Sequence, residues 1–138
     1  MADRRSILIS IRQKYVECII NGEKRAEIRR IFPDGVSRVY VYVPTPKRYV
    51  IGFFEVKEVH RLPIAQLWEQ AGRISALSQD YFFAYLSGKE VGASIHFDEF
   101  TVLPHSIPLA ELRRHFPKFH PPQSFMYVSE DMETLLLK

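Results

Sequence analysis

The residues best suited to chemistry form a G-x-K-x-x-E-x-R pattern made by Gly22, Lys24, Glu27 and Arg29. Gly22 follows a short amphipathic segment and can end a helix in the left-handed conformation that costs other residues energy. Glu27 and Arg29 begin an extended segment, and residues two apart on a strand point to the same face. Because Lys24 lies in the intervening turn, the pattern predicts that three charged side chains gather in one place, where they can grip a polar ligand.

These three charged residues would divide the work of binding between them. Lys24 and Arg29 offer donors to a phosphate or to a base carbonyl, Arg29 as a rigid fork and Lys24 as a point charge. Glu27 can accept a hydrogen bond from an exocyclic amine or hold the two cations in place. The alternative is a solvated surface group, since exposed Glu/Arg pairs stabilise a protein by less than about 1 kcal/mol.

Two further basic regions suit nucleic acid. Lys47 and Arg48 follow a stiff Pro-Thr-Pro tip, and the run 113–120 carries three fixed cations, two histidines and two phenylalanines without an acid. Cations interleaved with aromatic residues suit single-stranded nucleic acid, whose bases stack while its phosphates pair. The alternative for Phe116 and Phe119 is that they anchor the core. The predicted backbone contacts in these regions are Lys47, Arg48, Arg113, Arg114 and Lys118.

Other kinds of site lack support in the sequence. One cysteine excludes an internal disulfide, and the glycines are scattered singly rather than gathered in a phosphate loop. The five histidines lack the close spacing of metal ligands, so neither a metal nor a cofactor is predicted. The N-terminus has no signal-peptide pattern, and no apolar run approaches the length of a membrane span, so we expect a cytoplasmic protein without a membrane partner.

The 138 residues are predicted to form one domain, because 46% hydrophobic residues can bury a sizeable core. The formal charge of +3 is compatible with nucleic-acid binding and does not demonstrate it. Periodicity predicts strands over 6–11, 25–31, 36–43, 49–60, 91–103 and 124–128, with a bend or bulge at Gly52. Helices are predicted over 12–21, from 63 through 68, and over 79–86, 106–115 and 130–137. The predicted fold is mainly β with peripheral helices (α+β), a closed or nearly closed β-barrel.

Two smaller groups of residues have open roles. Tyr81 and Tyr85 belong to an aromatic helix face that is either core or the border of a cleft, where a tyrosine can stack on a base. Gln123 and Ser124 start the last predicted strand. They either contact a base edge through the amide and the hydroxyl or help to close the barrel.

The chain resembles the ASCH family of the PUA-like superfamily over about residues 7–127. The resemblance is carried by the motif, by its position after a first strand and helix, and by the later Pro-Pro-Gln-Ser-Phe-Met-Tyr run. It implies a small PUA-like β-barrel with a cleft whose rim carries Lys24, Glu27 and Arg29. It also implies that RNA, another single-stranded nucleic acid or a nucleotide-like molecule is the partner.

The resemblance leaves an enzymatic alternative open. In one ASCH group, amidohydrolases that act on acylated cytidine nucleosides, the position matching Glu27 is a nucleophilic threonine, and this chain has no hydroxyl there. That group also uses a glutamate on a later strand, for which Glu55 is the nearest counterpart and Glu58 the next. A hydrolase acting on RNA or a modified nucleoside would use Lys24, Glu27 and Glu55, the two carboxyl groups acting as acid and base. A third alternative is a module that binds a protein or a small regulator.

Overall fold

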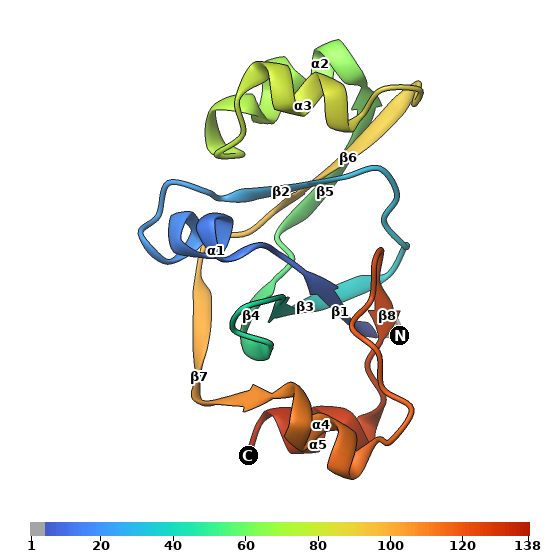
Figure 1. Cartoon of the computed structure of the whole chain (residues 1–138). Helices are drawn as coiled ribbons and strands as arrows, with labels where there is room; N and C mark the ends of the chain where they lie inside the picture. Colours follow the sequence, from blue (N-terminus) through green and yellow to red (C-terminus); the bar gives the residue numbers. More distant parts are fainter. Residues whose placement is uncertain (1–4) are drawn as a thin grey trace.

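The computed structural model describes residues 5–138, which form eight strands in two sheets with helices at both ends (Figure 1). The five-stranded sheet has the order β7-β4-β3-β1-β8, and the three-stranded sheet has the order β2-β6-β5. The strands are β1 (Arg5–Ser10), β2 (Ala26–Arg29), β3 (Val36–Val43), β4 (Tyr49–Glu55), β5 (Glu58–Pro63), β6 (Val91–His96), β7 (Phe100–Pro108) and β8 (Met126–Tyr127). The helices are α1 (Gln13–Ile20), α2 (Ile64–Ala71), α3 (Gln79–Tyr85), α4 (Leu109–His115) and α5 (Glu130–Leu136), with a short 3-10 turn, η1 (Gly72–Ile74).

The centre of the five-stranded sheet is buried on both faces. Strands β1 and β3 pair in parallel, and successive residues of β1 enter different apolar clusters. Ile7 and Ile9 pack in the cluster that includes residues of the three-stranded sheet, whereas Leu8 packs with residues of α4 and α5. This pattern explains why β1 is almost continuously hydrophobic, as expected for a strand covered on both sides.

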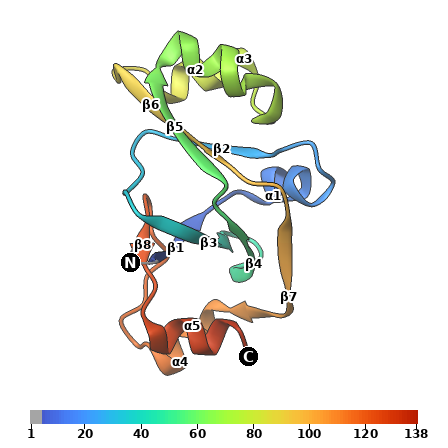
Figure 2. The ribbon, with the colours of Figure 1, turned by 180° about the vertical axis from the view of Figure 1, so that it is seen from behind.

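A third apolar cluster fastens α2 and α3 to the three-stranded sheet. Leu67 and Phe82, both fully buried, pack against Ala26 and Ile28 of β2. Ser78 begins α3 as predicted, because its hydroxyl accepts a hydrogen bond from the Tyr81 N–H at 3.1 Å. The helices α2 and α3 therefore lie at one end of the molecule and α4 and α5 at the other, which Figures 1 and 2 show from opposite sides.

Two predicted long strands are wrong in the same way. Residues 49–60 form β4 and β5, and residues 91–103 fall in β6 and β7, with each strand of a pair in a different sheet. The apolar alternation runs on through both breaks, so the sequence pattern does not mark where the chain leaves one sheet for the other. The irregularity predicted at Gly52 is confirmed. The register of β4 against β7 shifts between Val50 and Gly52, and a Cβ on Gly52 would lie 2.2 Å from the Thr101 carbonyl oxygen.

The remaining differences from the prediction concern the ends of elements. Helix α4 starts at Leu109 rather than at residue 106, because residues 106–108 continue β7. The last strand comprises only Met126 and Tyr127, which pair with Leu8 and Ile7. Within residues 5–138, no helix is long and apolar enough to cross a membrane.

Candidate functional site

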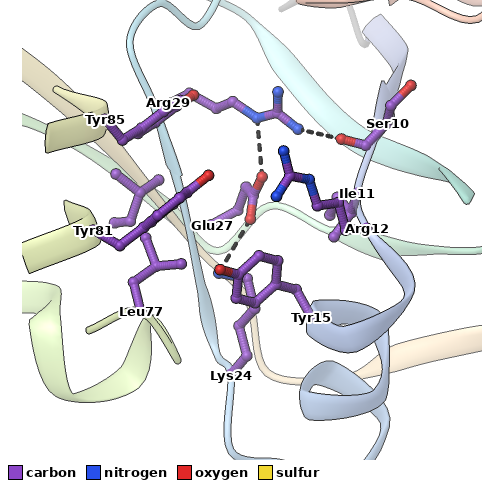
Figure 3. Close-up of a pocket in the computed structure, with 11 residues that line it drawn as sticks. Ser10, Ile11, Arg12, Tyr15, Lys24, Glu27, Arg29, Leu77, Tyr81 and Tyr85 are labelled. Atoms are coloured by element: carbon purple, nitrogen blue, oxygen red, sulfur yellow. Dashed lines mark hydrogen bonds and ion pairs between the residues drawn. The ribbon is translucent and has the colours of Figure 1, made fainter. Parts of the chain in front are cut away.

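A pocket of about 120 Å³ opens where α1, β2 and α3 approach one another (Figure 3). Strand β2 and the turn before it contribute the charged residues of the motif, and the other lining residues come from β1, from α1 and its start, and from α3 and the loop before it. The lining residues used below are Ser10, Arg12, Tyr15, Lys24, Glu27, Arg29, Tyr81 and Tyr85.

The turn after α1 places Lys24 at the bottom of this pocket. Gly22 has φ +88°, as predicted for the residue that ends the helix, and the Lys24 N–H donates to the Cys18 carbonyl at 3.0 Å. The Lys24 side chain is only 1% exposed. Its Nζ donates to the Ser75 carbonyl oxygen at 2.6 Å and lies 3.2 Å from Glu27 Oε1. A buried ammonium is thus paired with one carboxylate and one carbonyl.

Glu27 joins Lys24 to Arg29. The second carboxylate oxygen, Oε2, lies 3.0 Å from Arg29 Nε, an ionic contact to which the Nε–H is poorly directed. Arg29 Nη2 donates to the Ser10 carbonyl oxygen at 2.8 Å, so the guanidinium is tied to β1 as well as to its own strand. The three charged side chains therefore meet as their spacing predicts. Lys24 and Glu27 are buried, and Arg29 is partly buried. We call Lys24, Glu27 and Arg29 the pocket cluster.

Tyrosines form the opposite wall. The rings of Tyr81 and Tyr85, one helical turn apart on α3, lie parallel with their centroids 6.1 Å apart, and Tyr15 approaches Tyr81 at 6.3 Å. Burial raises the pKa of the Tyr85 phenol above its ordinary value. Of the two roles considered for the aromatic face, Tyr81 and Tyr85 border the pocket, whereas their neighbour Phe82 is core.

A second pocket, of about 440 Å³, adjoins the first and shares Arg29 and Tyr85 with it. Gln123 and Ser124 line this second pocket, so the structure brings both residues to the motif. Their loop is held in place by the Ser10 hydroxyl, which donates to the Pro122 carbonyl oxygen at 2.9 Å.

The structure does not bring Glu55 to the pocket cluster. Glu55 ends β4 opposite Arg38 of β3, and its Oε1 lies 2.6 Å from Arg38 Nη2. It lines a different hollow together with Glu133, and neither Glu55 nor Glu58 borders the pocket of Glu27. The structure therefore does not bring Glu27 and Glu55 to one pocket as the predicted acid and base pair. The sequence pattern did not indicate that Glu27 and Glu55 would belong to different sheets.

The other two basic regions also lie apart from the pocket cluster. Lys47 and Arg48 are exposed in the turn between β3 and β4. Arg113 and Arg114 lie on α4, with Lys118 just after it, at the end of the molecule opposite α2 and α3 (Figures 1 and 2). These five cations do not line either pocket of the motif, so the geometry gives no continuous track from Arg29 to them.

The two phenylalanines of the run 113–120 agree with the alternative interpretation, in which they anchor the core. Phe119, 5% exposed, is a core residue, and Phe116 packs against the same apolar cluster while partly buried. The Phe119 carbonyl accepts a hydrogen bond from Arg113 Nε at 3.2 Å.

The histidines are partly brought together without forming a metal centre. His60 and His96 lie in contact on β5 and β6, with ring centroids 4.9 Å apart. In the part of the chain that the structure describes, no group of three or more His, Cys, Asp or Glu side chains is placed to hold a metal ion.

Sequence reasoning missed part of the pocket wall. Ser10, Arg12 and Tyr15 line the pocket, and none of them belongs to the motif. Tyr15 lies beneath the Lys24 ammonium, with Nζ 5.5 Å from the ring centroid. The available signal was the position of Tyr15 on the helix that leads into Gly22, which places its ring beside the motif turn.

Known proteins are similar to this chain in sequence, in structure or in both. A relative named ASCH domain-containing ribonuclease, from Zymomonas mobilis subsp. mobilis, is 28% identical over 131 residues, which cover 94% of this chain and 88% of the relative. The crystal structure of ASCH from Zymomonas mobilis superposes with a TM-score of 0.90 at 27% identity, covering 98% of this chain and 95% of that one. The N-terminal domain of Staphylothermus marinus McrB shares the fold alone, with a TM-score of 0.62 and 9% identity over 96% of this chain and 92% of that one. No family model matches the sequence.

The fold is therefore α+β with the barrel-like architecture of PUA-like proteins. The similarities in sequence and in structure both support the resemblance of this chain to the ASCH domain family.

Proposed function

We propose that the protein binds single-stranded RNA, with one nucleotide engaged by the pocket between α1, β2 and α3. The observation that carries the proposal is a concentration of positive charge. Among residues 5–138, five lysines and arginines line the two adjoining pockets, whereas Glu27 is the one acidic residue that does. The rest of the chain has a slight excess of acids, so the net charge of +3 is focused on this side. The five cations are Arg12, Lys24, Arg29, Arg30 and Lys89.

The arrangement of side chains fits a nucleotide. Glu27 is engaged by a cation at each oxygen, so its role is to hold Lys24 and Arg29 in position. Arg29 uses Nη2 and Nε for these protein contacts, which leaves Nη1 for a phosphate oxygen. The ring of Tyr81, 38% exposed, supplies a surface for base stacking. The relative from Zymomonas mobilis, named a ribonuclease, supports RNA as the ligand.

A second candidate function, cleavage of RNA, is favoured by the name of the same relative. Here Glu27 would accept the proton of the ribose 2′-hydroxyl as the 2′-oxygen bonds to phosphorus and the bond from phosphorus to the 5′-oxygen breaks, with water giving a proton to the departing 5′-oxygen. Arg29 would stabilise the negative charge that develops on the phosphate oxygens. Lys24 would hold the Glu27 carboxylate in position through their ion pair. Glu55 has no part in this scheme, because it lies in a different hollow.

Binding and cleavage are tested in one experiment on labelled single-stranded RNA and DNA at two salt concentrations. The variants are Arg29→Gln, Glu27→Gln and, as a matched control, Arg114→Gln on the exposed side of α4. Circular dichroism first establishes that each variant is folded. We expect wild-type affinity to fall steeply with salt and Arg29→Gln to weaken binding about tenfold, as for the loss of a charge-assisted contact, while Arg114→Gln behaves like wild type.

The recovered RNA separates the two candidates. Intact RNA with binding lost in Arg29→Gln supports a binding module. Cleavage that disappears in Glu27→Gln while binding persists supports the hydrolase. If the wild-type protein neither binds nor cleaves either nucleic acid, both candidates are wrong.

A further inference from the structure

Arg29 stands at the junction of the two pockets. Its guanidinium is fixed by the Ser10 carbonyl at 2.8 Å and by Glu27 at 3.0 Å, and it lines both hollows together with Tyr85. A phosphate placed against Arg29 would therefore face the first pocket on one side and the second on the other. In a nucleic acid, such a phosphate joins two nucleotides.

The second pocket has the chemistry of a phosphate subsite. Arg30 and Lys89 line it, no acidic residue does, and neither cation forms an ion pair within residues 5–138. Arg30 Nη1 donates to the carbonyls of Tyr85 at 2.7 Å and Ser87 at 2.9 Å, which fixes the guanidinium at the end of α3. Lys89, a half-buried residue, follows on the same connection.

Neutral donors and acceptors complete this pocket. Gln123 and Ser124 lie on the loop that the Ser10 hydroxyl ties down through Pro122, and Ser10 also anchors Arg29 through its carbonyl. One residue of β1 therefore positions elements of both pockets. An amide and a hydroxyl beside two cations can contact the ribose or the base that accompanies a phosphate.

The sizes of the two pockets match a ligand longer than one nucleotide. The first, at about 120 Å³, is smaller than the 300–1,000 Å³ typical of sites that enclose a drug-sized ligand, whereas the second, at about 440 Å³, falls within that range. We infer that the ligand is an RNA segment of at least two nucleotides, whose linking phosphate lies against Arg29 and whose next phosphate lies between Arg30 and Lys89. This inference rests on the proposed function and adds a minimum length and a second subsite to it.

The test is calorimetric binding of nucleoside monophosphates and of the matching 5′-phosphorylated dinucleotides and trinucleotides, one series for each base. The sugars are 2′-O-methylated, so that no 2′-hydroxyl can attack the chain. The test variant is Lys89→Gln. The matched control is Lys47→Gln, which removes the same charge from the exposed turn outside both pockets. Arg30 is left intact because it also holds the end of α3.

We expect the dinucleotide to bind about tenfold more tightly than the monophosphate, the gain typical of one charge-assisted contact. Lys89→Gln should abolish this gain, leave the affinity for the monophosphate unchanged, and reduce the slope of log affinity against log salt by about 0.7 for the dinucleotide. Lys47→Gln should reproduce wild type. Equal affinities for one and two nucleotides, or a gain that survives in Lys89→Gln, would overturn the second subsite while leaving the proposed function standing. Absence of binding to every ligand in the wild-type protein would instead overturn the proposed function.

Discussion

Two clusters in this molecule pair arginine with glutamate in different settings, one largely buried and one exposed to solvent. The pocket cluster joins Lys24, Glu27 and Arg29, whose side chains are 1%, 10% and 12% exposed. A second group, here called the surface cluster, joins Arg38, Glu55 and Glu133 around the Tyr40 hydroxyl, and its three charged side chains are 27%, 57% and 31% exposed. Each cluster holds an arginine between carboxylate and backbone or tyrosine oxygens, so composition does not distinguish them.

The difference lies in what each cluster holds together. Arg38 and Glu55 are direct neighbours on adjacent strands, an ordinary cross-strand pair. In the pocket cluster, Lys24 reaches the Ser75 carbonyl and Arg29 reaches the Ser10 carbonyl, so the charges connect three segments that are far apart in sequence. Burying such charges costs free energy unless each one is paired. A cluster that carries this cost and also lines a pocket is the better candidate for function.

The largest expected effect is the loss of stability when a charge of the pocket cluster is removed. We expect Lys24→Met to lower the free energy of unfolding by about 3–5 kcal/mol, because it leaves the Ser75 carbonyl and one oxygen of a buried carboxylate without their cation. Urea denaturation followed by circular dichroism measures this change. Lys57→Met, at an exposed ion pair with Asp98, is the control and should change stability by less than about 1 kcal/mol. A similarly small effect of Lys24→Met would mean that the buried ammonium contributes little.

The next effect concerns ligand affinity. Tyr81→Ala removes the exposed stacking surface of the pocket, so we expect RNA affinity to fall about tenfold, within the 1–3 kcal/mol typical of a stacked base. Tyr81→Phe should retain the affinity because it keeps the ring. Tyr127→Ala removes a tyrosine of similar exposure near the surface cluster and serves as the control in the same anisotropy titration. An equal loss in Tyr127→Ala would show that the effect is not specific to the pocket.

The surface cluster is expected to make the stability of the protein depend on pH at high pH. Burial, with the hydrogen bond to Glu133 as the next cause, raises the pKa of Tyr40 to about 12 from an ordinary value of 10. Between these values the unfolded chain loses the phenolic proton and the folded protein keeps it. Stability therefore falls as pH rises, by roughly 1.4 kcal/mol per pH unit from this group.

Removing the Tyr40 hydroxyl isolates that contribution. We expect Tyr40→Phe to flatten the decline in the free energy of unfolding between pH 10 and pH 12, as measured by urea denaturation at each pH. RNA affinity at neutral pH should stay the same, since Tyr40 does not line the pocket of the motif. An unchanged decline in Tyr40→Phe would assign the loss to other groups, such as Tyr42 and Tyr85, whose pKa values burial also raises.

Rules that depend only on neighbouring residues in the sequence predicted the charged residues of the site but not the residues of the pocket wall around them. The strand period placed Glu27 and Arg29 on one face, and the glycine at 22 set the turn that delivers Lys24, because both effects depend only on neighbours in sequence. Tyr15 was missed, because its position beneath the Lys24 ammonium depends on how α1 packs beside β2.

The same limit explains the errors in the fold. A strand that crosses from one sheet to another keeps its two-residue period, so residues 49–60 looked like one strand when they are two. That crossing is also why Glu55 was misplaced. It belongs to the last residues of β4, before the chain moves to the sheet that carries Glu27.

The smallest expected effect tests the assignment of Glu55 itself. Arg38 would not be left isolated in Glu55→Gln, because its guanidinium lies 4.1 Å from the centre of the Phe53 ring and its Nη1 lies 3.7 Å from Glu133 Oε2. With Glu55 more than half exposed, we expect a change in the free energy of unfolding below about 1 kcal/mol. RNA affinity and any cleavage should equal those of wild type, whereas Glu27→Gln alters at least one of them. If Glu55→Gln instead abolished cleavage at unchanged stability, the surface cluster would be a second working site, and its exposure would no longer argue against function.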